Sequence, residues 1–185
     1  MPFSVWLGRL VLDADIRQYG DDRNPGAANA WRAGKWRVGL PALVLDFLKG
    51  ALPVGLAHFG FKITGWELVP IALAPVFGHA FTPFLKFRGG KALAVTFGVW
   101  TGILPPAAPL ILGIVMGGCM LLRLADAWAV VAGMLGLLVF LIFYQPAGFV
   151  FAIWVANLSV LILKNRRELR QAMRSSPRRF ARQAD

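Results

Sequence analysis

The chain has 185 residues, of which 57% are hydrophobic, and its mean hydropathy of +0.61 is too apolar for a soluble domain of this size. The formal net charge is +11, but the cations gather in short connections and in a C-terminal tail, so we predict no nucleic-acid partner. A single cysteine excludes an intrachain disulfide, and with only two histidines we predict no metal and no cofactor.

Apolar runs separated by short polar breaks predict an all-α, polytopic membrane bundle, because only helices and closed barrels satisfy their own backbone groups in hydrocarbon. Runs such as residues 135–143 do not alternate as barrel strands do. Several spans fall short of the ~20 residues that cross ~30 Å of hydrocarbon. We expect one membrane domain over residues 1–185, with seven short spans at 1–12, 38–57, 67–84, 91–104, 106–123, 127–144 and 147–164.

The first predicted span is incomplete. A helix over residues 1–12 rises only ~18 Å, and the segment lacks the charged start and small-residue cleavage site of a signal peptide. It is therefore either a half-helix or part of a longer span. We expect an in-frame upstream extension of about ten or more apolar residues.

Basic residues fall on one side of this topology. Seven crossings place the odd-numbered connections, their flanks and the C-terminus together, and 17 of the 20 Lys and Arg residues lie there, against Lys62 alone on the other side. Positive charge marks the cytoplasmic side of a membrane protein. We therefore predict a cytoplasmic C-terminus, with residues 164–185 forming a basic tail that attracts anionic lipid headgroups.

The first connection holds the motif Asn24-Pro25-Gly26-Ala27-Ala28-Asn29-Ala30-Trp31-Arg32. Asn24, Gly26 and Asn29 tolerate tight turns that aim backbone N–H groups at an anion, and Arg32 can bind a phosphate through two hydrogen bonds. An ordinary turn with a solvated arginine would explain the same residues. The motif alone leaves both interpretations open.

A second cationic motif joins the third and fourth spans, where Gly78-His79-Ala80-Phe81 is followed by Phe87-Arg88-Gly89-Gly90-Lys91-Ala92. A Gly-Gly-Lys sequence that opens a helix can place N–H groups, the positive end of the helix dipole and an ammonium around one phosphate. It is not the nucleotide P-loop, whose spacing differs. The alternative is a plain turn with His79 as a satisfied interior histidine.

Two further carboxylates stand out. Asp46 and Lys49 lie three residues apart on one face of the second span, which predicts an interior ion pair with a structural role. Asp126 opens the sixth span, where it would cap the helix or contribute to the site.

These residues together resemble the bacterial acyl-phosphate–glycerol-3-phosphate acyltransferase family (PlsY type). The family pattern Ser-Gly-Asn-x-Gly-Ala-Thr-Asn-x-x-Arg is matched at Asn24, Gly26, Ala27, Asn29 and Arg32. The pattern Asp-x-x-Lys-Gly is matched at Asp46, Lys49 and Gly50. The patterns Gly-His-x-Phe and Phe-Lys-Gly-Gly-Lys-Gly are matched at Gly78, His79, Phe81, Phe87, Gly89, Gly90 and Lys91. The resemblance covers most of the chain and implies seven spans in a bacterial inner membrane, with a cytoplasmic active site.

The resemblance implies transfer of a fatty acyl group from acyl phosphate to the 1-hydroxyl of glycerol 3-phosphate, giving lysophosphatidate and phosphate, the first step of phospholipid synthesis. Lys91 and Arg32 would be catalytic, because they would stabilise charge on the departing phosphate. The acceptor's proton would pass to the substrate phosphate, Asp22 or Asp126. Residues implied in substrate binding are Asn24, Gly26, Asn29, His79, Gly89, Gly90, Asp22 and Asp126. The implied partners are acyl phosphate, glycerol 3-phosphate and membrane lipids.

The chain departs from the family pattern mainly in the acceptor half. The family serine and glycine that precede Asn24 fall on Asp22 and Arg23, and the glycine after Lys91 is Ala92. In the tail, a family asparagine falls on Glu168. Carboxylates repel a bound phosphate, so we expect compensation by neighbouring arginines.

We expect Arg23 to pair with Asp22, and Arg166 or Arg167 to offset Glu168. The alternative to catalysis is a non-catalytic or altered-acceptor relative that binds acyl phosphate or lipid. A transporter would require matched broken helices in the two halves of the chain, which the sequence lacks.

Overall fold

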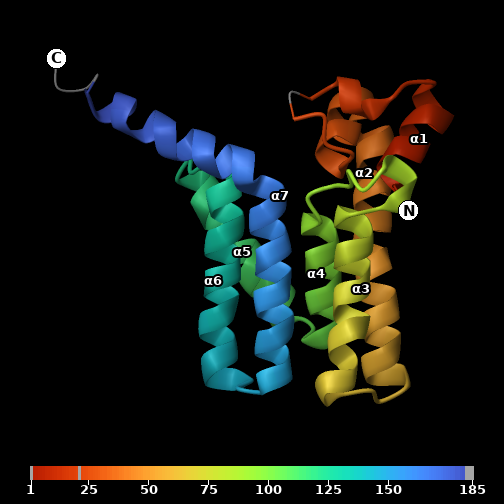
Figure 1. The fold of residues 1–185 in the computed structure, drawn as a ribbon, viewed down its shortest axis with the longest axis vertical. Coiled ribbons are helices and arrows are strands. Elements are labelled where there is room, and N and C mark those ends of the chain that lie inside the picture. Colours follow the sequence, from red (N-terminus) through yellow and green to blue (C-terminus); the bar gives the residue numbers. More distant parts are fainter. Residues whose placement is uncertain (1, 21, 182–185) are drawn as a thin grey trace.

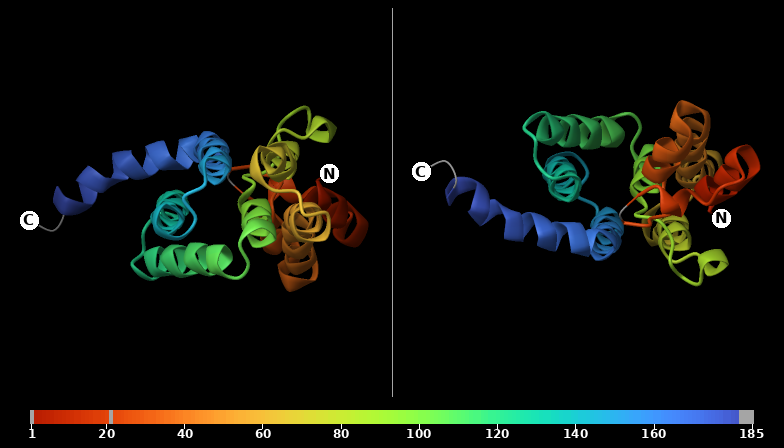
Figure 2. Two further views of the ribbon diagram at one scale, coloured as in Figure 1. Left: turned by 90° about the horizontal axis from the view of Figure 1, so that it is seen from below. Right: turned by 90° about the horizontal axis from the view of Figure 1, so that it is seen from above.

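The computed structural model describes residues 2–20 and 22–181, with side-chain positions up to residue 173 of the last helix. Within this part the chain is all helical, as predicted, and its helices are α1 (Phe3–Leu12), α2 (Ala27–Gly55), α3 (Leu68–Ala80), α4 (Leu93–Ile103), α5 (Ala107–Leu121), α6 (Asp126–Tyr144) and α7 (Gly148–Ala181). Figure 1 shows α1 to α4 grouped on one side and α5 to α7 on the other. Seen along the bundle, α7 is the helix of the second group that faces the first, and it packs on both α3 and α6 (Figure 2).

Each predicted span overlaps one helix of the structure. Among the described residues, four segments are long and apolar enough to cross a bilayer, namely Ala27–Gly60, Gly65–Leu85, Asp126–Tyr144 and Gly148–Met173. The shorter apolar helices are Phe3–Leu12, Leu93–Ile103 and Ala107–Leu121. The membrane bundle predicted from the apolar runs is therefore confirmed.

Two predicted boundaries were wrong. Helix α2 begins at Ala27 rather than at residue 38, and it bends at Gly34 and Lys35, whose backbone angles are not helical. Helix α7 continues past residue 164 to Ala181, so much of the predicted tail is helical. Both errors have one cause: hydropathy reports which residues suit hydrocarbon, whereas a helix can continue into water through Ala, Arg, Glu and Gln. Arg182 of the predicted tail lies outside the described residues.

Close contact between α2 and α4 fixes the start of α4. A Cβ atom on Gly50 would overlap the backbone of α4 at Val95, and one on Gly98 would overlap the backbone of α2 at Phe47. Small residues let two membrane helices approach this closely. The contact holds the connection before α4, which contains Lys91, against α2.

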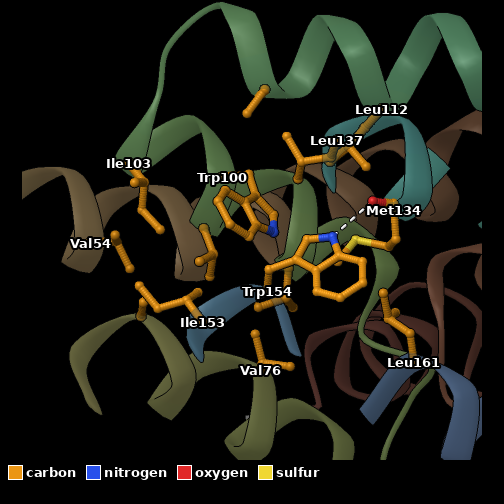
Figure 3. Packing of buried hydrophobic residues seen from close by; sticks show 14 of the residues in the cluster. Val54, Val76, Trp100, Ile103, Leu112, Met134, Leu137, Ile153, Trp154 and Leu161 are labelled. Carbon is orange, nitrogen blue, oxygen red and sulfur yellow. Dashed lines mark hydrogen bonds between the residues drawn. The ribbon is translucent and has the colours of Figure 1, made fainter. Parts of the chain in front are cut away.

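The core is built around two tryptophans, Trp100 of α4 and Trp154 of α7, which Figure 3 shows among aliphatic side chains. The Trp154 indole N–H donates to the Met134 carbonyl at 2.8 Å. The Trp100 indole donates to Asn157 at 3.0 Å, and the amide of Asn157 donates to the Thr96 hydroxyl at 3.0 Å. These buried bonds tie α7 to α6 and to α4, because an unpaired polar group in an apolar interior is costly.

The predicted basic side of the protein is one end of the bundle. The connections α1–α2, α3–α4 and α5–α6 all lie at the upper end of the bundle in Figure 1, and the C-terminal part of α7 leans away from the bundle at the same end. Segments far apart in the sequence therefore share this end.

Candidate active site

The start of α2 holds Arg32 through a chain of hydrogen bonds. The Asn29 side chain is 1% exposed, and its amide nitrogen donates to the Asp22 carboxylate and to the Asn24 carbonyl, both at 2.9 Å. Its amide oxygen accepts from Arg32 at 2.7 Å. Gly26, in an extended conformation, is the N-cap residue of α2. The predicted phosphate motif is thus an ordered helix start with the Arg32 side chain exposed, rather than a loose loop.

The α3–α4 connection is packed too tightly for side chains at Gly89 and Gly90. The Gly89 N–H donates to the Ala80 carbonyl at 3.1 Å, and a Cβ atom there would overlap the backbone of His79 and Ala80. A Cβ atom on Gly90 would overlap the His79 ring. Both glycines are therefore required by close approach. The Gly89 N–H already has a backbone partner, so this group does not point at an anion in the structure.

Lys91 brings three segments together. Its ammonium lies 2.6 Å from the Glu168 carboxylate of α7 and 3.0 Å from the Asp22 carboxylate of the α1–α2 connection. Desolvation opposes the charge on Lys91, but the hydrogen bonds with Glu168 and Asp22 outweigh it and raise the pKa of Lys91. Desolvation also opposes the charge on Asp22, yet hydrogen bonds from Asn29 and Lys91 hold the pKa of Asp22 below its usual value.

His79 lies behind the glycine loop. Its ring is 8% exposed, and its Nδ1 atom lies 3.6 Å from the Asp46 carboxylate, which also pairs with Lys49 at 2.5 Å. The predicted Asp46–Lys49 pair is confirmed. The His79 ring packs against Gly90, and its predicted contact with substrate stays a prediction.

Helix α7 contributes two side chains one turn apart. The Lys164 ammonium donates to the Ala80 carbonyl at 2.8 Å and lies 5.3 Å from the centre of the Phe81 ring. Glu168 follows four residues later and reaches Lys91. Sequence reasoning missed Lys164 as part of the site, because it assigned every cation from 164 onward to the tail. The i, i+4 spacing of Lys164 and Glu168 was the available signal, since it places them on one face of a continuing helix.

Three expectations about carboxylates need correction. Asp22 pairs with Lys91 rather than with Arg23, which has a φ of 49° and is exposed. Glu168 likewise contacts Lys91, not the exposed Arg166 or Arg167. Asp126 is the first residue of α6, Ala125 is the N-cap residue, and no side-chain capping bond forms there. Within the described part of the chain, no hydrogen bond or ion pair joins Asp126 to the Lys91 cluster.

Comparison with known proteins shows the family of the chain. The family model described as "Glycerol-3-phosphate acyltransferase" matches residues 1–175. Glycerol-3-phosphate acyltransferase 1 of Thermotoga maritima is 35% identical over 178 residues, covering 89% of this chain and 87% of that protein. Glycerol-3-phosphate acyltransferase of Fusobacterium nucleatum is 27% identical over 180 residues, covering 97% and 91%.

Solved structures agree as well. The glycerol 3-phosphate form of PlsY, an integral membrane glycerol 3-phosphate acyltransferase, is 27% identical and superposes with a TM-score of 0.82, covering 94% of this chain and 88% of that one. Its lysophosphatidic acid form gives a TM-score of 0.81. The resemblance predicted from the motifs is confirmed: the chain belongs to the glycerol-3-phosphate acyltransferase family of the PlsY type.

Proposed function

We propose that this protein transfers a fatty acyl group from acyl phosphate to the 1-hydroxyl of glycerol 3-phosphate, giving lysophosphatidate and inorganic phosphate. Family membership supports the acyltransferase reaction and the glycerol 3-phosphate acceptor. The observation that carries the proposal is the meeting of Lys91, from the α3–α4 connection, with the Asp22–Asn29–Arg32 chain at the start of α2. Two cations from distant segments thereby face one region at one end of the bundle.

In the proposed reaction the acceptor oxygen attacks the acyl carbon, and the bond from that carbon to the phosphate oxygen breaks. The electron pair leaves with the phosphate, whose growing charge Lys91 and Arg32 would stabilise. Phosphate is already a good leaving group, so no nucleophilic side chain is required.

The acceptor hydroxyl must also lose its proton. Asp22 is a poor base, because hydrogen bonds from Asn29, Lys91 and the Asn24 N–H stabilise its charged form and keep its pKa low. Asp126 shares no hydrogen bond or ion pair with the cluster among the described residues. These observations favour a substrate phosphate as the proton acceptor.

We place the site on the cytoplasmic side of a bacterial inner membrane. The end of the bundle that carries the site is also the cation-rich end, and positive charge marks the cytoplasmic side. Acyl phosphate and lysophosphatidate are amphiphiles, so their chains would stay in the bilayer while their headgroups reach Lys91.

A reconstitution experiment tests the proposal. Purified protein in detergent is mixed with acyl phosphate, with and without glycerol 3-phosphate, and phosphate release and lysophosphatidate are measured. We expect both products only when the acceptor is present. Lys62→Ala, a charge change in the α2–α3 connection far from the site, is the matched control and should behave as wild type. Binding of acyl phosphate without any product would identify a non-catalytic relative.

A further inference from the structure

The Lys91 ammonium is contacted by two carboxylates, which together carry more negative charge than its single positive charge can neutralise. Two carboxylates from two different segments contact its single ammonium, at 2.6 Å and 3.0 Å. A phosphate that binds Lys91 must therefore share the ammonium with these carboxylates or displace one of them. Like charges held around one cation repel each other, so sharing is the costlier outcome.

The two carboxylates differ in how firmly they are held. Asp22 also accepts hydrogen bonds from the Asn29 side chain and the Asn24 N–H, at 2.9 Å and 3.1 Å. These bonds fix it within the α1–α2 connection. Glu168 projects from α7, beyond the part of that helix that packs in the core, and within the described part of the chain its carboxylate bonds to Lys91 alone. The two side chains are similarly exposed, at 28% for Asp22 and 32% for Glu168, so the difference lies in their hydrogen bonds. Because a glutamate has three rotatable bonds and water lies within reach, Glu168 is the carboxylate that can leave.

We propose that Glu168 sets the acceptor affinity of the site by competing with the acceptor's phosphate for Lys91. Glycerol 3-phosphate then binds when the Glu168 carboxylate turns toward solvent and releases the ammonium, while Asp22 stays in place. Glu168 is thus a specificity-determining residue that disfavours dianionic acceptors. This inference rests on the proposed function only in its choice of acceptor.

Lys164 keeps α7 in place when Glu168 releases Lys91, so that only the Glu168 side chain has to move. Its ammonium donates to the Ala80 carbonyl at 2.8 Å, so α7 stays attached to the α3–α4 connection when the Glu168–Lys91 pair opens. Glu168 can therefore move without displacing the helix.

The test compares Glu168→Gln with wild type in purified full-length protein. Glutamine keeps the shape and can still accept a hydrogen bond from Lys91, but it carries no charge. We expect the KM for glycerol 3-phosphate to fall up to about fivefold, the size of one part-exposed charge contact. Any change in the KM for acyl phosphate should have the same direction, because its headgroup also reaches Lys91. Glu168→Asp, which keeps the charge, should stay close to wild type. Glu67→Gln, at an exposed glutamate before α3, is the matched control and should change neither value.

Calorimetric titration of glycerol 3-phosphate, without acyl phosphate, separates this inference from the proposed function. Tighter binding to Glu168→Gln without any acyl transfer would leave the inference standing and remove the function. An unchanged or lowered acceptor affinity would overturn the inference, because Glu168 would then only tie α7 to the loop. A lower kcat with unchanged KM would also overturn it, since Glu168 would then take part in proton removal.

Discussion

Replacing Lys91 with alanine should abolish most acyl transfer and leave the fold intact. Loss of one donor that stabilises charge in the transition state costs roughly 10²–10³-fold in kcat, which corresponds to roughly 2.7–4 kcal/mol. The ion pairs lost with Lys91 are part-exposed, since its side chain is 29% exposed, and each such pair contributes roughly 0.2–1 kcal/mol to stability.

The substitution also leaves two carboxylates facing each other. Asp22 and Glu168 contact the same nitrogen, so their oxygens lie no more than about 6 Å apart. Their repulsion would be roughly 0.7 kcal/mol in water and roughly 3 kcal/mol at the effective dielectric constant of a protein surface. We expect the melting temperature in detergent to fall by a few degrees, too little to explain a hundredfold loss of activity.

Two variants separate these effects. Lys91→Ala combined with Glu168→Gln should regain much of the lost stability, because the repulsion is removed, but none of the activity. Lys91→Arg keeps the charge and should retain the fold with reduced turnover, because a planar guanidinium cannot take the place of the ammonium. Phosphate release by the Lys91→Ala protein within threefold of wild type would remove Lys91 from the catalytic machinery.

Three further predictions follow from the same geometry. Arg32→Ala should lose roughly 10²–10³-fold in kcat with little change in melting temperature, and normal turnover would place the phosphate elsewhere. Ala92→Gly should raise the melting temperature, because Ala92 has a φ of 63°, a conformation that costs a non-glycine residue about 1 kcal/mol; no rise would mean that the strain is absorbed elsewhere. Asp22→Asn should be less stable than wild type at pH 7, and the difference should shrink as the pH falls below about 4, because a lowered pKa contributes stability that is present above the unfolded pKa and lost as the pH falls through the folded one. A stability difference that does not shrink as the pH falls would show that the hydrogen-bond geometry of Asp22, not its charge, is what matters.

Local patterns in the sequence were sufficient for much of the fold. Each apolar run contains a helix, because hydrocarbon leaves the backbone few alternatives. The pairing of Asp46 with Lys49 followed from their i, i+3 spacing, which holds wherever the segment is helical. Family motifs predicted Lys91 and Arg32 as catalytic residues without any knowledge of how their segments meet, and these roles stay predictions.

Pairing between distant segments could not be predicted in the same way. Glu168 and Lys91 are 77 residues apart, and their contact depends on α7 continuing as a helix into the polar region. The tail was assigned by charge alone, so this continuation was missed. Arg23 was expected to pair with Asp22 because it is adjacent in sequence, but adjacent residues in a turn often point in different directions.

The charge of the cluster explains how carboxylates can stand at a phosphate site. Arg32, Lys91 and Lys164 carry three positive charges, and Asp22 and Glu168 carry two negative charges. Adding a dianionic acceptor to all five groups would leave a net charge of about −1 in a partly desolvated region, which is unfavourable. If Glu168 turns to solvent, the same acceptor meets three cations and one carboxylate, and the charges balance. The site can therefore accept glycerol 3-phosphate while Asp22 stays in place, held by its hydrogen bonds with Asn29 and Asn24.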